Sequence, residues 1–275
     1  MSELSEWLVA SDIDGTLLDK KLFHIPKRNI EAIDRLINVH GGNFTLASGR
    51  GEFAVRKHYD SIPGKKCPAV VYNGAGIYDF EQEKMLWFSP INEEQRNFAK
   101  MIMRKFPNLE AEVYTPERIY QVNPGISAAV MSFVKRPKLV RAKTLNDIPQ
   151  DDWAKIVFYG VPAFIQTLRS YVKLNTESTT NFMDSSPMTY EMVNSEANKW
   201  LAIVKLAEIM GIDKKKIAVI GDHYNDYEML KNAPVSACCG QSPRGIKYVA
   251  KMQTCHCNRG AVADLIEYLE ERYNK

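Results

Sequence analysis

Short apolar runs that alternate with helical patterns constrain the fold of this chain more than any other feature. Leu8–Ala10, Phe44–Ala47 and Ala69–Tyr72 are nearly continuous apolar runs, and polar residues follow each of them. Runs of this kind are typical of parallel strands that are covered on both faces. Between the first two runs, Ile30 to Ile37 form a helical pattern that a proline precedes and two glycines follow. The first third of the chain therefore predicts the β-α-β rhythm of a doubly wound sheet.

The same rhythm returns in the last third of the chain. Apolar residues within 200–210 share one helical face, and a glycine ends that helix. Ile217–Ile220 is the clearest buried strand pattern, and the last helix near the C-terminus also has one apolar face. We therefore expect an α/β core built on a doubly wound, Rossmann-like parallel sheet.

Residues 83–187 depart from this rhythm, because helical and short strand patterns are mixed in them. We expect residues 1–82 and 188–275 to form the core, interrupted by an inserted α+β cap at 83–187. Ile77–Asp79 and Lys84–Phe88, on either side of the first expected boundary, have the pattern of a hairpin or an exit segment. Further helices are expected at Glu93–Phe106, Ser127–Val134 and Ala163–Val172, and further strands at Glu112–Thr115, Arg118–Val122, Lys155–Tyr159, Thr179–Met183 and Met188–Val193.

Polar side chains stand at the carboxyl ends of the predicted parallel strands. Asp12, Ser48, Asn73 and Asp222 each follow one of these apolar runs. In an open α/β sheet, ligands bind beyond the carboxyl ends of the strands, near the point where the strand order reverses. The four side chains could therefore gather around one small anion.

Two carboxylates, Asp12 and Asp14, follow the first strand. Residues at i and i+2 of an extended segment point the same way, so both acids could face one site, and Gly15 permits a sharp exit turn. A calcium loop would need an acid or Asn at Thr16 and Gly at Leu17, so that pattern fails. A surface turn remains the alternative interpretation of these residues.

A second acidic group follows the strand that ends at Ile220. Asp222 and Asp226 lie in a run of acids of the kind that suits Mg²⁺, whose ligands are carboxylate oxygens and water. The alternative is that Asn225 or Asp226 simply caps the helix that follows. Lys199 lies at the start of the helical pattern within 200–210, and it could simply be a solvated lysine at that position.

Four motifs occur in the order of the haloacid dehalogenase superfamily. They are residues 12–17 (Asp-Ile-Asp-Gly-Thr-Leu), 46–50 (Leu-Ala-Ser-Gly-Arg), 198–199 (Asn-Lys) and 221–226 (Gly-Asp-His-Tyr-Asn-Asp). The chain resembles the Cof-type sugar-phosphate phosphatases of this superfamily, which carry a large α/β cap between the second and third motifs. Residues 73–75 and 258–262 also fit the Cof pattern, so the resemblance spans nearly the whole chain.

The resemblance implies a phosphatase that works through an aspartyl-phosphate. Asp12 would attack phosphorus, and Asp14 would protonate the leaving oxygen and then deprotonate the attacking water. Mg²⁺ would be held by Asp12, the backbone carbonyl of Asp14 and Asp222. The remaining residues of the expected site are Ser48, Gly49, Asn73 and Lys199 for binding phosphate, with Asn225 and Asp226 supporting the metal or Lys199.

Two positions depart from the pattern of the family. The second motif begins with Ser48 where Thr is more common, and serine keeps the hydroxyl. Trp200 follows Lys199 where the family usually has glycine, and it could pack into the core or narrow the entrance. Arg50 could touch phosphate or form an ion pair within the core. In the cap, Tyr114, Tyr120, Trp153 and Tyr159 could be core residues or substrate contacts.

Composition adds expectations about location and partners. The formal net charge is only +3, which does not favour nucleic-acid binding. No stretch approaches the ~20 apolar residues of a membrane span, and the N-terminal residues lack the pattern of a signal peptide. Five cysteines form an odd set that suits reduced thiols. We expect a cytoplasmic monomer or weak homodimer whose partner is a small phosphorylated metabolite, with neither nucleic acid nor membrane.

Three alternative functions are weighed against the phosphatase. A phosphomutase or phosphotransferase on the same scaffold would use the same two aspartates. A signalling receiver domain would carry its acceptor Asp at the end of the third strand, where this chain has Asn73. A catalytically silent member would bind metal without turnover, and the intact set of motif residues argues against it.

Overall fold

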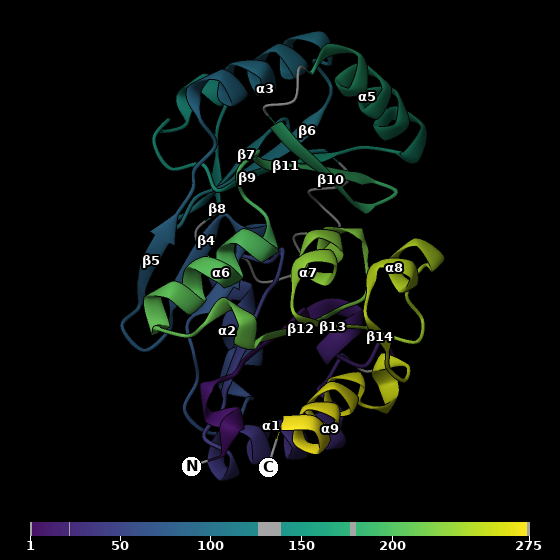
Figure 1. Ribbon diagram of the computed structural model, residues 1–275. Helices are drawn as coiled ribbons and strands as arrows, with labels where there is room; N and C mark the ends of the chain where they lie inside the picture. The colour runs from purple at the N-terminus through teal and green to yellow at the C-terminus, as the bar shows by residue number, and fades with distance from the viewer. Residues whose placement is uncertain (1, 22, 126–138, 177–179, 274–275) are drawn as a thin grey trace. The chain divides into compact units, whose positions relative to one another are not determined.

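The computed structural model describes residues 2–21, 23–125, 139–176 and 180–273. The chain divides into two compact units (Figure 1): residues 1–87 with 198–275, and residues 88–197. We call the first the core unit and the second the inserted unit. Among the described residues, no helix is both long and apolar enough to cross a membrane.

A five-stranded parallel sheet forms the centre of the core unit, in the order β14-β13-β12-β1-β2. From β1 the chain passes to β2 on one side, and β12, β13 and β14 later fill the other side. The strand order therefore reverses between β1 and β12, where such sheets bind ligands. This sheet confirms the expected fold class. Its strands are β1 (Leu8–Ser11), β2 (Asn43–Leu46), β12 (Ile217–Gly221), β13 (Val235–Cys238) and β14 (Met252–Gln253).

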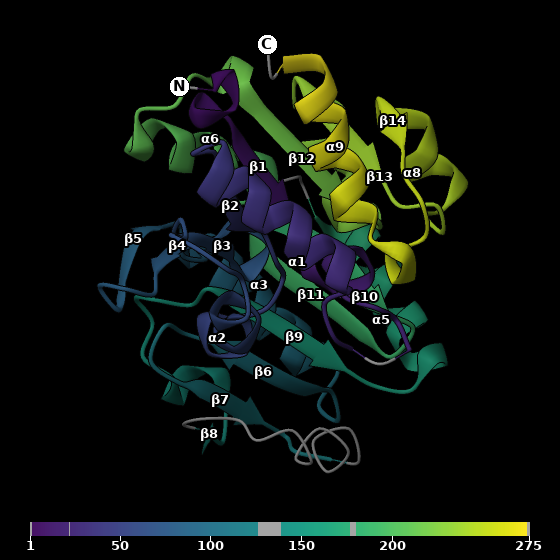
Figure 2. The ribbon, with the colours of Figure 1, turned by 90° about the horizontal axis from the view of Figure 1, so that it is seen from below.

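Helices cover both faces of this sheet, as a doubly wound fold requires. Leu8 and Ala10 of β1 share a buried apolar cluster with Ile203 of α6 and Met229 of α7. Figure 2 shows α1 and α9 side by side on the opposite face. The helices are α1 (Lys27–Asp34), α6 (Lys199–Met210), α7 (Tyr227–Asn232), α8 (Arg244–Val249) and α9 (Ala261–Tyr273).

A small three-stranded sheet, in the order β3-β4-β5, extends the core unit. Its strands are β3 (Ala69–Val71), β4 (Gly76–Asp79) and β5 (Lys84–Phe88). A parallel bridge between Ala47 and Val70 joins it to the end of β2. The helix α2 (Glu52–Asp60) lies between β2 and β3 in the chain. The expected strand at 69–72 and the hairpin after it are both present.

The inserted unit is a six-stranded, mostly antiparallel sheet in the order β10-β11-β9-β6-β7-β8, with α3 and α5 packed on one face. Trp153 is buried in the cluster beneath these helices, and Tyr120 packs against it, so both serve the core of this unit. The helix expected at 127–134 lies outside the described residues. The elements are β6 (Glu110–Tyr114), β7 (Ile119–Val122), β8 (Leu139–Arg141), β9 (Lys155–Tyr159), β10 (Thr180–Ser186), β11 (Thr189–Asn194), α3 (Glu93–Lys105) and α5 (Pro162–Asn175).

The units divide at 87/88 and 197/198, rather than at the expected 82/83 and 187/188. The first difference arises because β5 belongs to the same sheet as β3 and β4 of the core unit. The second arises because β11 pairs with β9 and β10 of the inserted unit. Strand pairing therefore decides both boundaries: β5 pairs with β4 of the core unit, and β11 pairs with β9 and β10 of the inserted unit.

Candidate active site

Asp12 stands directly beyond β1, at the point where the strand order reverses. Its backbone N–H donates to the carbonyl of Ile220 at 3.0 Å, so pairing with β12 continues past the end of β1. The residue is only 4% exposed. Gly15 follows with φ of 80°, and a β-carbon there would overlap the Asp222 carboxylate. Only glycine lets this turn pass so close to the second acid.

Lys199 is buried in the same place. Its ammonium nitrogen donates to Oδ1 of Asp12 and to Oδ1 of Asp226, both at 2.6 Å. Lys199 is the first residue of α6, and the side chain of Asn198 caps that helix by accepting the N–H of Leu201 at 2.9 Å. The Lys199 side chain is 1% exposed, so the interpretation of a solvated lysine is wrong.

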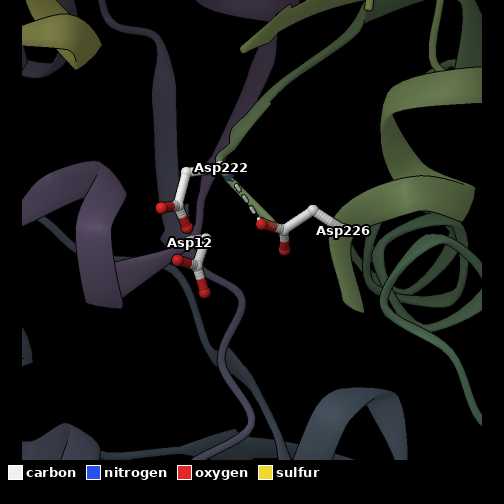
Figure 3. Close-up of side chains that lie close together, drawn as sticks. All are labelled: Asp12, Asp222 and Asp226. Atoms are coloured by element: carbon white, nitrogen blue, oxygen red, sulfur yellow. Dashed lines mark hydrogen bonds between the residues drawn. The ribbon is translucent and has the colours of Figure 1, made fainter. Parts of the chain in front are cut away.

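Asp222 and Asp226 complete an acidic cluster with Asp12 (Figure 3). Each of the three offers a carboxylate oxygen, and these atoms lie within 4.8 Å of one another. Oδ1 of Asp226 accepts from Lys199, while Oδ2 accepts the backbone N–H groups of Asp222 at 2.8 Å and His223 at 3.2 Å. Asp226 therefore holds Lys199 and the end of β12 in place. In the described part of the chain, no other group of acids, histidines and cysteines is arranged to hold a metal ion.

The environment of the cluster changes its ionisation. Burial raises the pKa of Asp12 to about 8, although the neighbouring Lys199 ammonium opposes this shift. Burial opposes the charge on Lys199, but Asp12 and Asp226 more than offset it and raise its pKa. Burial and then Asp226 raise the pKa of Asp222, against the opposing charge of Lys20. Three buried carboxylates thus lie close together. An additional cation beside them would favour their ionised forms.

Ser48, Gly49, Asn73 and Asn225 form a second polar group of the core unit. The N–H of Asn73 donates to the Ser48 carbonyl at 2.9 Å, and the Asn225 amide donates to Oδ1 of Asn73 at 3.3 Å. A β-carbon on Gly49 would overlap the Asn73 amide, so glycine allows their close approach. Asn73 has φ of 57°, in the left-handed region that costs an ordinary residue about 1 kcal/mol or more. Asparagine tolerates this region better than most residues, because its short amide can hydrogen-bond nearby backbone.

Asp14 lies apart from the three buried acids, with its side chain 53% exposed. Arg50 binds both carboxylate oxygens, through Nε at 2.7 Å and Nη2 at 2.6 Å. Of the two roles open to Arg50, the structure therefore shows the ion pair. The predicted role of Asp14 in proton transfer, and that of its carbonyl toward a metal, stay predictions.

Two polar contacts of the site could not be found in the sequence. The Lys20 ammonium lies 3.1 Å from Oδ2 of Asp222, and the amide of Gln241 donates to the Gly15 carbonyl at 2.5 Å. Lys20 stands in a pair of lysines and Gln241 in a polar loop, so neither local pattern differs from that of solvated residues. Trp200 packs beside the apolar cluster under α6, which accounts for a large side chain after Lys199.

Comparison with known families shows a match along nearly the whole chain. A model of the haloacid dehalogenase-like hydrolases matches residues 9–266. A crystal structure of a haloacid dehalogenase-like hydrolase from Bacteroides thetaiotaomicron is similar with a TM-score of 0.80 and 25% identity. That match covers 96% of this chain and 99% of the other.

Two curated relatives come from Bacillus subtilis. Phosphatase YwpJ is 23% identical over 293 residues, which cover 95% of this chain and 99% of the relative. 5-Amino-6-(5-phospho-D-ribitylamino)uracil phosphatase YitU is 22% identical over 273 residues, which cover 96% and 98%. Both matches span the core unit and the inserted unit, so the similarity concerns the whole arrangement of motifs and insertion.

Proposed function

This chain belongs to the haloacid dehalogenase-like hydrolase family and is a phosphatase, and we propose that it hydrolyses small phosphorylated metabolites with the help of Mg²⁺. Sugar phosphates are the first substrate class to test. The observation that carries the proposal is the buried contact of Lys199 with Asp12 and Asp226, beside Asp222. A carboxylate held this way at a strand end is suited to attack an anionic ester, because positive charge accompanies it.

Asp12 would act as the nucleophile. One of its oxygens forms a bond to phosphorus while the bond from phosphorus to the leaving oxygen breaks. Water then attacks the phosphoryl group on Asp12, which releases phosphate and restores the carboxylate. Lys199 binds Oδ1 of Asp12 and so leaves Oδ2 as the oxygen for attack. The Lys199 ammonium also offers positive charge to the phosphoryl group.

Asp14 would move the protons of the two steps. It gives a proton to the leaving oxygen in the first step and takes one from water in the second. Ser48, Gly49 and Asn73 would bind the phosphoryl oxygens with hydroxyl, backbone and amide groups. The close approach of Gly49 to Asn73 supports a shared role for them.

The residues present fit a magnesium ion. Asp12 and Asp222, with the backbone carbonyl of Asp14, would hold it, and all these donors are oxygens, which Mg²⁺ prefers. Both carboxylate oxygens of Asp226 are already engaged, so Asp226 would support the site through Lys199. When bound, Mg²⁺ neutralises charge between the carboxylate and the phosphate ester.

The inserted unit would act as the cap that selects the leaving group. The relative YitU is named for a phosphate ester on a ribityl chain, which supports small hydroxyl-rich phosphates as substrates here. A phosphomutase would use the same aspartates but return an isomerised sugar phosphate. Release of free phosphate, measured together with the dephosphorylated product, separates the two functions.

The test is hydrolysis of p-nitrophenyl phosphate with and without Mg²⁺ by wild type and Asp12→Asn. We expect Mg²⁺-dependent activity in wild type and a fall of at least about a thousandfold in Asp12→Asn. Asp79→Asn is the matched control, because Asp79 is a buried acid of the same unit that accepts the N–H groups of Glu81 and Gln82. Equal activity in wild type and Asp12→Asn, or none in wild type, contradicts the proposal.

A further inference from the structure

Three side chains form a line of hydrogen bonds that begins at Asp14 and ends inside the core unit. Arg50 binds both oxygens of Asp14, and its third nitrogen, Nη1, lies 2.9 Å from Nε2 of His58. His58 is on α2, whose buried face it shares with Val55 and Tyr59. Exposure falls along the line: the Asp14 side chain is 53% exposed, that of Arg50 31%, and His58 8%. The half-exposed acid is thus connected to a buried anchor.

The direction of the innermost hydrogen bond follows from chemistry. A guanidinium can only donate, so Nε2 of His58 accepts, and the imidazole is neutral with its proton on Nδ1. Burial, followed by the charge of Arg50, lowers the pKa of His58 to about 4, which agrees with a neutral ring. His58 is therefore a fixed acceptor for Arg50 near neutral pH.

Asp14 depends on such an anchor, because among the described residues only Arg50 hydrogen-bonds its side chain. It lies in a non-helical turn between Asp12 and Gly15, and half of its side chain faces solvent. An exposed ion pair by itself contributes little to stability. A two-pronged contact with a guanidinium fixes the plane of a carboxylate, provided that the long arginine side chain is itself held. The Tyr72 N–H holds the Arg50 carbonyl at 2.9 Å, and His58 holds the far end of the side chain.

We infer that His58 is a positioning residue for proton transfer: through Arg50 it holds the Asp14 carboxylate in the orientation in which it exchanges protons with the leaving oxygen and with water. The inference rests on the proposed function, in which Asp14 moves these protons. His58 itself touches no substrate. A purely structural His58 would instead serve only to stabilise α2 against the sheet.

The two roles differ in how the loss of His58 depends on the leaving group. Proton donation matters most when the leaving anion is unstable, so phenyl phosphate depends on Asp14 far more than p-nitrophenyl phosphate does. We therefore compare kcat/KM, which reports the first chemical step, for the two esters. His58→Leu removes the acceptor, and His58→Gln supplies an amide oxygen in its place. Val55→Ala perturbs the same buried helix face but removes no hydrogen-bond acceptor.

In His58→Leu we expect kcat/KM for phenyl phosphate to fall about tenfold and that for p-nitrophenyl phosphate to fall less than about threefold. His58→Gln restores most of the loss, and Val55→Ala leaves the ratio of the two esters unchanged. Asp14→Asn shows the same selectivity with a larger loss. Arg50→Lys keeps the charge but loses the two-pronged contact. It should also lower kcat/KM more for phenyl phosphate than for p-nitrophenyl phosphate, and it provides this test if His58→Leu does not fold.

The results distinguish failure of this inference from failure of the proposed function. An equal loss on both esters, or no loss, in His58→Leu and Arg50→Lys overturns the positioning role while the phosphatase stands. If Asp14→Asn loses both esters equally, Asp14 is not the proton donor, and the positioning role fails with it. A wild type that hydrolyses neither ester overturns the proposed function itself.

Discussion

The core unit and the inserted unit each bury charged side chains, but they place and balance them differently. In the core unit the charges lie beyond strand ends, where Asp12, Asp222 and Asp226 meet one buried lysine, Lys199. In the inserted unit the charges lie within strands, on the sheet face opposite to α3 and α5. The first arrangement gathers buried charge at the edge where a parallel sheet binds ligands, whereas the second buries it among the side chains of one sheet face.

The inserted unit satisfies its charges within its own strands. Glu112 accepts the hydroxyls of Tyr114 at 2.9 Å and Tyr159 at 2.7 Å, together with the Gln121 amide at 3.3 Å. Lys155 pairs with Glu191 at 2.9 Å, so that acid is balanced by one base. Tyr114 and Tyr159 are thus both partners of Glu112 in this unit.

The core unit gathers its acids around shared cations instead. Its three carboxylates lie within 4.8 Å of one another and share the Lys199 ammonium and the half-exposed Lys20. Glu112 and Glu191 in the inserted unit each have their own partners. Buried charges without compensation are costly and are retained where they bind a cation or act in chemistry. The crowded carboxylates of the core unit therefore favour binding of a further cation, whereas each acid of the inserted unit already accepts from donors within its own sheet.

The two buried lysines provide the strongest test of this comparison. Lys199→Met should lower turnover of p-nitrophenyl phosphate by a hundredfold or more, at about 1.4 kcal/mol of lost stabilisation per tenfold. Lys155→Met should leave that turnover within about twofold and instead lower the free energy of unfolding by about 3 kcal/mol, because it removes a partner of buried Glu191. Steady-state kinetics and urea unfolding of both variants measure the two effects. If Lys155→Met lost as much turnover as Lys199→Met, the buried charges of the two units would not differ in function.

Binding of Mg²⁺ gives the next test, because the ion should stabilise the protein only through the acidic cluster of the core unit. At a hundred times its dissociation constant the ion should add about 2.7 kcal/mol to the free energy of unfolding, seen as a higher melting temperature. Asp222→Asn should abolish this increase, whereas Glu191→Gln in the inserted unit should retain it. Calorimetry with Mg²⁺ and with EDTA measures the difference. If Mg²⁺ raises the free energy of unfolding of Asp222→Asn as much as that of the wild type, Asp222 is not a ligand of the ion.

The strand-end residues of the core unit were predictable because a general rule places them. Parallel strands end at one edge of the sheet, so Asp12 and Asp222, which follow buried runs, had to lie close to each other once β1 and β12 paired. The separate roles proposed for Asp14, Ser48 and Asn73 come from the resemblance to a family. Periodicity alone left a surface turn open for Asp12 and Asp14.

The remaining features depend on partners that are far away in the sequence. A lysine at a helix start has the same local sequence pattern whether it is solvated or buried. Lys199 is buried because it binds acids that include Asp226, which is 27 residues away in the sequence. β11 was expected in the core unit, but its pairing with β9 assigns it to the inserted unit. The sequence does not indicate that Glu112 is buried, because a charged residue in a strand pattern is ordinarily solvent-exposed. Its acceptor role needs three donors from three different strands.

Acid should weaken the core unit through His58. Because the pKa of His58 falls from an ordinary 6.5 to about 4 on folding, the unfolded chain binds a proton between these values that the folded protein does not. Stability is therefore lost as the pH falls from about 6.5 toward 4, by up to about 3 kcal/mol. Urea unfolding of wild type and His58→Gln across this range measures the loss, and the variant should show a flatter profile. Parallel profiles would mean that other groups cause the decline.

The smallest expected effect concerns the complete network of the inserted unit. Tyr159→Phe removes one of the hydroxyls that donate to Glu112, and hydrogen bonds to a charged acceptor contribute about 2 kcal/mol. Tyr171→Phe is the control, because among the described residues its hydroxyl has no hydrogen-bond partner, while its ring packs against Phe106 at 5.3 Å. Urea unfolding should show a loss near 2 kcal/mol in the first variant and almost none in the second. An unaltered stability in Tyr159→Phe would mean that Glu112 does not depend on its full set of donors. The inserted unit would then differ less from the core unit than its hydrogen bonds suggest.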